Sequence, residues 1–483
     1  MLPQNKEASS STDEPFPYNY RKWIPEFKTE TLLSKLKHPN HLIRVVQYNI
    51  LCDSLLPIST KIIEEDIKLL PHLSWENRSQ KILNELKTIN ADLIGLTEIE
   101  NDVNFIKKLH ESNYEFALKP RPGKHSEGCG IAWKINKFEL IDLLCIEYNM
   151  NNTPNDQSPI YGRDNVALIG ILKVNEISNT IILFVNTHLL FNSNRGDIKL
   201  GQIYQLTITL DELRKKYEQL NNKVYIIVTS DLNSIPKSAV YKLLTTGKLD
   251  CNKIEKRSIS GQDADNLQYV NPPTKIRSYL FSRILGKYND DNSNNNNIKK
   301  NYKNDGIPNG DNNRWYNEIC RVKPKINEHH VNLEYNNEYR HKDTDLILEL
   351  PFKYESAYSN IAKSIFENLS ENNNKLPFNI LENELNEVEI NAIKMGKRDI
   401  EKTKSFIKNL TLENPVSSYS NDTVSSLDYI FYYSKENDMK PVRVLNVPDI
   451  YSLFFDIGYM PNDIFPSDHL SLAADIIIGE ETL

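Results

Sequence analysis

The chain has 483 residues, a formal net charge of -7 and 39% hydrophobic residues, which allows one large core or two ordinary domains. No apolar run approaches the roughly 20 residues of a membrane-spanning helix, and the N-terminus lacks the basic and apolar regions of a signal peptide. We therefore expect no membrane association and a cytoplasmic protein, with the nucleus as the alternative. Five cysteines without CxxC spacing indicate reduced thiols and argue against a zinc site.

The first 40 residues are polar and predict a tail that docks near its end. After it, short β-branched apolar runs alternate with helical patterns, and the main helices are expected at 77–90 and 196–220. Strands are predicted at 43–51, 91–99, 130–135, 166–174, 180–190, 223–232, 425–433, 442–447 and in the last ordered stretch, 465–476.

Two polar regions interrupt this pattern. Residues 255–340 contain a tract rich in Asn, Lys and Asp, and residues 360–412 are highly charged, so neither is expected to build a core. The segment 346–359 between them is short and apolar, and strands resume after 412. The two regions are therefore predicted to be insertions into one domain that covers residues 41–480.

Polar side chains recur where the predicted strands begin or end. Each has an ordinary structural explanation when taken alone, such as an Asx-turn, a cap or a hydrogen-bonded core residue. A carboxylate or amide at an apolar strand end is costly to desolvate unless it is paired or binds an ion, so the recurrence on separate strands indicates a shared site. The residues are Asn49, Glu98, His188, Asp231, Asn233, Asp428, Asp468 and His469.

These side chains suit metal-assisted attack on a phosphoester. Asn49 and Glu98 are hard oxygen ligands of the kind that Mg²⁺ prefers, with Mn²⁺ as the alternative ion. Asp231 could orient or deprotonate a water, and Asn233 could hold a phosphate oxygen. Asp428 could fix the tautomer of His469 and favour its charged form, which would face the charge that develops on phosphorus.

Six blocks carry a resemblance to a known family, in its order: QYNILCD, LTEIE, VNTHLLFN, TSDLNS, SLDYIF and FPSDHLSL. They resemble the endonuclease/exonuclease/phosphatase superfamily over about 43–250, 345–360 and 415–478. The resemblance implies an α/β fold in which two mainly antiparallel sheets form a sandwich with helices on both outer faces. It also implies that His188, Asn233 and His469 bind phosphate while Asp428 and Asp468 order the site.

The blocks THLLFNSNRGDIKLGQIYQL, RDNVAL and SEGCGIAWK are similar to the Angel branch of the deadenylase-like nucleases. That similarity implies an RNA-processing phosphoesterase that removes 2′,3′-cyclic phosphates from RNA 3′ ends. A 3′–5′ poly(A) exonuclease is the second hypothesis, because relatives of this branch degrade poly(A). RNA is the implied partner, with translation or mRNA-decay factors as further ones.

Two departures from the family pattern motivate a third hypothesis, an inactive RNA or translation-factor adaptor. Ser230 stands where the family has Gly, which would strain a backbone with positive φ. Thr97 replaces the usual Gln before Glu98 and would weaken support for the metal ligand. Neither departure removes a catalytic group.

Several further residues are candidates for substrate contacts. Asn165 could shape the substrate mouth or end a turn, and Arg195 could contact phosphate or be a solvated charge in the first turn of a helix. Phe352 could stack on a base or pack in the core. The segment YLFSRIL (279–285) resembles the Tyr-x₄-aliphatic pair used by partners of the cap-binding translation factor.

Overall fold

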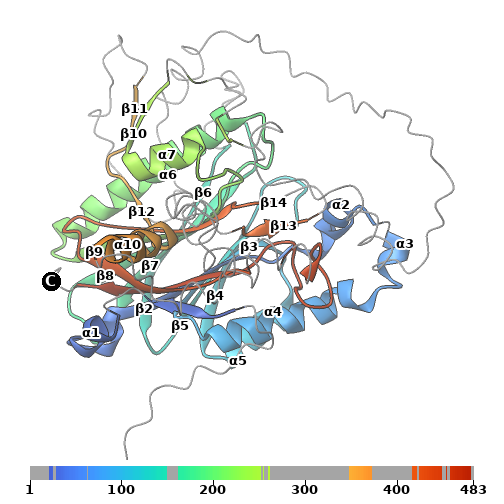
Figure 1. The fold of residues 1–483 in the computed structure, drawn as a ribbon, viewed down its shortest axis with the longest axis horizontal. Helices are drawn as coiled ribbons and strands as arrows, with labels where there is room; N and C mark the ends of the chain where they lie inside the picture. The colour runs from blue at the N-terminus through green and yellow to red at the C-terminus, as the bar shows by residue number, and fades with distance from the viewer. Residues whose placement is uncertain are drawn as a thin grey trace, which may run out of the picture.

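A computed structural model places the strands in two stacked sheets with helices outside them (Figure 1). Both predicted insertions lie almost wholly outside the residues that the structure describes, and so does the 279–285 segment. The structure describes residues 21–25, 29–62, 64–149, 162–251, 254, 259–261, 347–371, 416–420, 424–448, 453 and 457–479.

The first sheet has seven strands in the order β1-β16-β17-β2-β3-β5-β4. All its pairs are antiparallel except β2 with β3, which run parallel. Its strands are β1 (Trp23–Pro25), β2 (Leu42–Asn49), β3 (Leu93–Ile99), β4 (Tyr114–Pro120), β5 (Gly128–Lys134), β16 (Met439–Leu445) and β17 (Leu472–Ile478).

The second sheet has six strands in the order β12-β15-β9-β8-β7-β6. Here β8 and β9 are parallel and the other pairs antiparallel. The strands are β6 (Phe138–Glu147), β7 (Val166–Val174), β8 (Thr180–His188), β9 (Lys223–Asp231), β12 (Glu355–Ser356) and β15 (Asp428–Ser434).

The alternation of side chains along each strand explains how the sheets stack. In β2, Ile43 and Val45 join the core between the sheets, whereas Val46 and Tyr48 join a core on the outer face. A strand buried on both faces reads as a continuous apolar run, which is why IRVVQYNIL is recognisable in the sequence.

Helices cover both outer faces of the sandwich. Ile82 and Leu86 of α4 (Trp75–Ile89) and Phe105 of α5 (Val103–Glu111) pack on the seven-stranded sheet. The other sheet is covered by α6 (Gly196–Gln219) and α7 (Ala239–Thr246). The predicted sandwich with flanking helices is therefore confirmed. No helix in the described part of the chain is long and apolar enough to cross a bilayer.

The remaining elements are short. Outside the sheets lie α1 (Thr29–Ser34), α2 (Leu56–Thr60) and α3 (Glu64–Ile67), the pairs β10 (Lys248–Asp250) with β11 (Ile347–Glu349) and β13 (Ser418–Tyr419) with β14 (Val424–Ser425), and three 3₁₀ turns at Pro39–His41, Asp53–Leu55 and Pro71–Leu73.

Some predicted boundaries need correction. Helix α10 (Ala357–Glu371) runs across residue 360, where the second insertion was expected to start, because Ile361 and Ala362 are buried in the central core. Ile259 and Ser260 are likewise buried, although they lie in the first predicted insertion. The first 40 residues are not all tail, since β1 extends the sheet along β16. Strands β4 and β6 were not predicted, because charged residues interrupt their short apolar stretches.

Candidate active site

The predicted polar residues meet at one end of the sandwich because of strand direction. In the parallel pair β8 and β9, His188 lies opposite Asp231, and the antiparallel strand β15 places Asp428 opposite the same Asp231. In the other sheet, the parallel pair β2 and β3 ends with Asn49 and with Glu98 at a bulge beside it. The strand ends from both sheets therefore supply one site.

Asp231 is the centre of this group. Its Oδ2 accepts a hydrogen bond of 3.0 Å from Asn49 Nδ2 and lies 3.5 Å from His188 Nε2 and 3.8 Å from His469 Nε2. Its Oδ1 accepts a 2.9 Å bond from the backbone nitrogen of Asn233. The carboxylate is buried, so these contacts hold a negative charge between two imidazoles.

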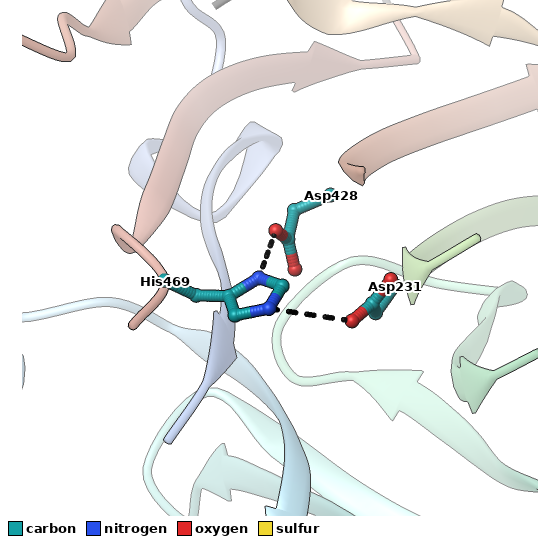
Figure 2. A group of neighbouring side chains, drawn as sticks. All are labelled: Asp231, Asp428 and His469. Carbon is teal, nitrogen blue, oxygen red and sulfur yellow. Dashed lines mark hydrogen bonds and ion pairs between the residues drawn. The ribbon is translucent and has the colours of Figure 1, made fainter. Parts of the chain in front are cut away.

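Asp428 and His469 form a buried pair, drawn in Figure 2 beside Asp231. His469 Nδ1 lies 2.7 Å from Asp428 Oδ2, which also accepts a 2.7 Å bond from Ser417 Oγ. Burial opposes the imidazolium, but the carboxylates of Asp428 and Asp231 outweigh it and raise the pKa of His469 well above its ordinary value. His469 is therefore a cation at neutral pH, with Nε2 turned toward Asp231.

His188 is the opposite case. Its Nε2 lies 2.9 Å from Asn233 Nδ2, and Asn233 also donates to the backbone oxygen of Leu189. Burial lowers the pKa of His188, and Asp231 only partly offsets it, so the ring is neutral at neutral pH. The site thus combines one cationic and one neutral imidazole around a single carboxylate.

Asn49 and Glu98 form the oxygen-rich side of the site. Asn49 Nδ2 donates to Glu98 Oε1 at 3.1 Å, and Glu98 sits at a β-bulge with φ of 54°. A positive φ is costly for a residue with a side chain, and such strain collects at functional positions. Burial and the Asp468 carboxylate raise the pKa of Glu98 to about 8. A divalent cation would favour the ionised form of Glu98 in this setting, so the carboxyl group fits a hard metal ion.

Another geometric group can be considered for the metal. One ligand atom from each of Asp231, Asp428 and His469 lies within 4.8 Å of the others, and all three residues are buried. In this group, however, His469 Nδ1 is already engaged by Asp428. The pair explains that geometry without an ion.

Asp468 lies beside the pair and is half-buried. Its Oδ2 accepts a 2.5 Å hydrogen bond from Ser59 Oγ of α2, and its charge adds to the negative potential at His469 and Glu98. The structure therefore places Asp468 in the site, as expected for an ordering residue.

The two departures from the family pattern do not damage the site. Ser230 lies in regular antiparallel pairing with Tyr429 and is not among the residues with positive φ, so the expected strain is absent there. Beside Thr97, Gln47 of β2 donates to Asp428 Oδ1 at 3.1 Å and accepts a 3.0 Å bond from Asn186. Gln47 thus supplies a buried amide behind the site.

Gln47, Asn186 and Thr229 form a polar layer between the sheets, and this layer requires β3 and β9 to approach closely. Asn186 Nδ2 donates to Thr229 Oγ1 at 3.0 Å, and a Cβ on Gly95 would lie 2.0 Å from the same hydroxyl. Sequence reasoning missed Gln47, although its place two residues before Asn49, on the same face of β2, was a usable signal. It also missed Ser417, for which we find no local signal.

The candidate substrate residues are placed differently from the prediction. Asn165 is buried, donates to the backbone oxygen of His188 at 3.1 Å and accepts from Gln202 at 3.1 Å, so it braces the end of β8. Arg195 is also buried and makes two bonds, of 3.0 and 3.1 Å, with Asp197. Lys199, in the same block, is buried and donates to the backbone oxygen of Asn233. None of the three is a solvated charge or an open mouth residue.

Phe352 is a core residue in this structure. Its ring stacks on Tyr433 with centroids 4.0 Å apart and meets Tyr354 at 5.0 Å. It is buried in the cluster between the six-stranded sheet and its helices. A base-stacking role for Phe352 is therefore not supported. The sequence alone does not distinguish a buried aromatic residue from one that is exposed to a ligand.

Comparison with known proteins identifies the family of this chain. The model of the Endonuclease/Exonuclease/phosphatase family matches residues 46–469. The chain belongs to this family. The match spans the first and last blocks of the site, from β2 to His469.

Relatives of two kinds appear among the matches. Carbon catabolite repressor protein 4 homolog 3 of Arabidopsis thaliana is 30% identical over 219 residues, 45% of this chain and 46% of that protein. Protein angel homolog 2 of Bos taurus is 32% identical over 225 residues, 45% of this chain and 40% of that protein. The chain thus spans less than half the length of these curated relatives, and the resemblance to Angel-type proteins is confirmed.

Solved structures agree on the fold. A crystal structure described as that of ANGEL2, a 2′,3′-cyclic phosphatase, superposes with a TM-score of 0.60 at 22% identity, covering 95% of this chain and 98% of that one. A complex of the same protein with adenosine-2′,3′-vanadate gives 0.57 at 23% identity, covering 94% and 98%.

Proposed function

We propose that the protein is a Mg²⁺-dependent phosphoesterase that acts on RNA 3′ ends and removes terminal 2′,3′-cyclic phosphates. The observation that carries the proposal is the arrangement around Asp231, with neutral His188 on one side and cationic His469 on the other. The similarity to ANGEL2, described as a 2′,3′-cyclic phosphatase, supports the choice of substrate.

Each residue has a role that follows from its environment. Asp231 is placed to orient a water and take its proton as the oxygen attacks phosphorus. His469, held by Asp428, faces the negative charge that grows on the phosphoryl oxygens, and the neighbouring His188 and Asn233 would exchange their mutual contact for one with a phosphoryl oxygen. Attack breaks one ribose O–P bond, and a second hydrolysis releases inorganic phosphate and leaves a 2′,3′-diol.

The metal would be held by Glu98 and Asn49. When bound, Mg²⁺ supplies a positive charge that polarises the phosphoryl group and stabilises the leaving oxygen. Mn²⁺ prefers similar oxygen ligands and is the expected substitute.

A 3′–5′ poly(A) exonuclease is the second candidate, and the carbon catabolite repressor 4 homologue among the relatives favours it. Both reactions need the same hydrolytic groups and differ in which bond is broken. An inactive adaptor is less well supported, since Thr97 and Ser230 leave the site intact.

Two short RNAs separate these functions, one ending in a 2′,3′-cyclic phosphate and the other in an oligo(A) tail with a free 3′ hydroxyl. We expect loss of the cyclic phosphate without shortening, dependent on Mg²⁺ and absent in Glu98→Ala. Progressive shortening of the oligo(A) tail would instead assign the exonuclease. Binding of either RNA without any reaction would assign the adaptor.

A further inference from the structure

One aromatic ring on the loop that follows β8 is exposed rather than packed. Phe191 keeps 75% of its surface exposed and is the one aromatic residue among the large exposed hydrophobics of the described chain. Phe352, the base-stacking candidate from the sequence, is buried. Single exposed apolar side chains are common, so it is the position of Phe191 in the chain that draws attention to it.

Phe191 lies directly beside the catalytic residues along the chain. It follows His188 by three residues, so the chain can separate the two by at most about 10 Å. That is a span of the order of one nucleotide. The length of the chain between His188 and Phe191 is therefore compatible with a nucleotide whose phosphate lies at His188 and Asn233 and whose base lies at the ring.

The loop that carries Phe191 is fixed on both sides. Before it, Leu189 N donates to the backbone oxygen of Asp231 at 3.0 Å, and Leu190 N donates to Gln202 Oε1 at 3.1 Å. After it, Arg195 N donates to the backbone oxygen of Asn192 at 3.2 Å, and Ser260 Oγ donates to the backbone oxygen of Ser193. A ring on a fixed backbone loses little entropy when a base stacks on it.

We infer that Phe191 is a stacking platform for the terminal nucleobase of the RNA substrate. This inference rests on the proposed function, because it takes the phosphate site as the anchor. Aromatic rings stack with every base, so the platform would select for the presence of a base rather than for one sequence. It assigns to Phe191 the role that the sequence suggested for Phe352.

The test compares ligands with and without a base. Wild type, Phe191→Ala, Phe191→Trp and, as a matched control, Leu220→Ala would be titrated with adenosine 3′-monophosphate and with ribose 3-phosphate in the presence of Mg²⁺. Leu220 is also an exposed apolar residue, 63% exposed, but it lies at the far end of α6. KM and kcat on RNA with a terminal cyclic phosphate, with and without the last base, would be measured in parallel.

We expect Phe191→Ala to weaken binding of the base-bearing ligand by about 5- to 150-fold and to raise KM on the complete RNA alike. Binding of ribose phosphate and kcat on the baseless end should stay unchanged, and Phe191→Trp should retain the affinity. Equal loss on both ligands, or no loss on either, would overturn the inference. Base binding that depends on Phe191 without turnover of the RNA would refute the proposed function and leave the platform standing.

Discussion

His469 Nδ1 lies 2.7 Å from Asp428 Oδ2 in a buried pair, and this contact keeps the imidazole charged and aimed at the site. The two residues come from positions 41 apart in the chain. The cation is preorganised, so it needs no reorientation when charge develops on phosphorus.

Removing this cation should slow the chemical step. We predict that His469→Ala lowers kcat on RNA with a cyclic phosphate end by about 10²- to 10³-fold, the scale for losing one preorganised transition-state contact. Steady-state kinetics with urea unfolding as the control for folding would check this. Near-normal turnover in a folded His469→Ala protein would remove His469 from the mechanism.

The charge of His469 also sets a pH dependence. Because Asp428 and Asp231 raise its pKa well above the ordinary value, the cation is present at neutral pH and is lost as pH rises through that raised pKa. With saturating Mg²⁺, which keeps Glu98 ionised, the kcat/KM profile should therefore be level near neutrality and fall in the alkaline range. In Asp428→Asn the alkaline fall in kcat/KM should move to lower pH. An unshifted profile would show that this fall does not report the titration of His469.

The metal site can be tested by binding as well as by rate. Glu98→Gln should weaken Mg²⁺ binding by calorimetry at least about tenfold, since even outer partners of a metal ligand have effects of this size. Burial and Asp468 already raise the pKa of Glu98 to about 8, so the neutral amide should leave the metal-free protein no less stable. Glu100→Gln, which changes the neighbouring half-buried carboxylate, is the control. Equal Mg²⁺ affinity in wild type and Glu98→Gln would place the ion elsewhere.

Gln47 is predicted to position Asp428. Gln47→Leu leaves Asp428 Oδ1 without its 3.1 Å donor in a buried setting, which should cost about 1–3 kcal/mol of stability. Turnover should fall as well, because the pair with His469 loses part of its support. Urea denaturation of Gln47→Leu beside the exposed Gln80→Leu measures this, and equal midpoints for the two would argue against the role.

The sequence was informative about the fold and the strand-end residues for one physical reason. Strands buried on both faces leave continuous apolar runs, so a polar residue at their ends stands out, as Glu98 and Asp231 do. Parallel pairs then bring those ends to a common edge. Strand β6 was not predicted, because Glu139 and Asp142 interrupt its apolar residues and it shows neither a continuous run nor a strict alternation.

Contacts between distant residues could not be predicted in the same way. Ser417 meets Asp428 through the β13–β14 hairpin, and Gln47 reaches it from the other sheet, so neither contact has a local signature. The aromatic residues could not be assigned from the sequence either. Nothing in the sequence around Phe352 or Phe191 shows which ring is buried and which is exposed, because that depends on packing.

The most direct test of the account measures phosphate release from a short RNA that ends in a 2′,3′-cyclic phosphate. Wild type and Asp231→Asn would be compared with Mg²⁺ and with a chelator, because Asp231 is the centre on which both histidines converge. We predict release by wild type only when Mg²⁺ is present, and a loss of about 10²-fold or more in Asp231→Asn. Release that is indifferent to Mg²⁺ or to Asp231→Asn, or no release at all, would contradict the account.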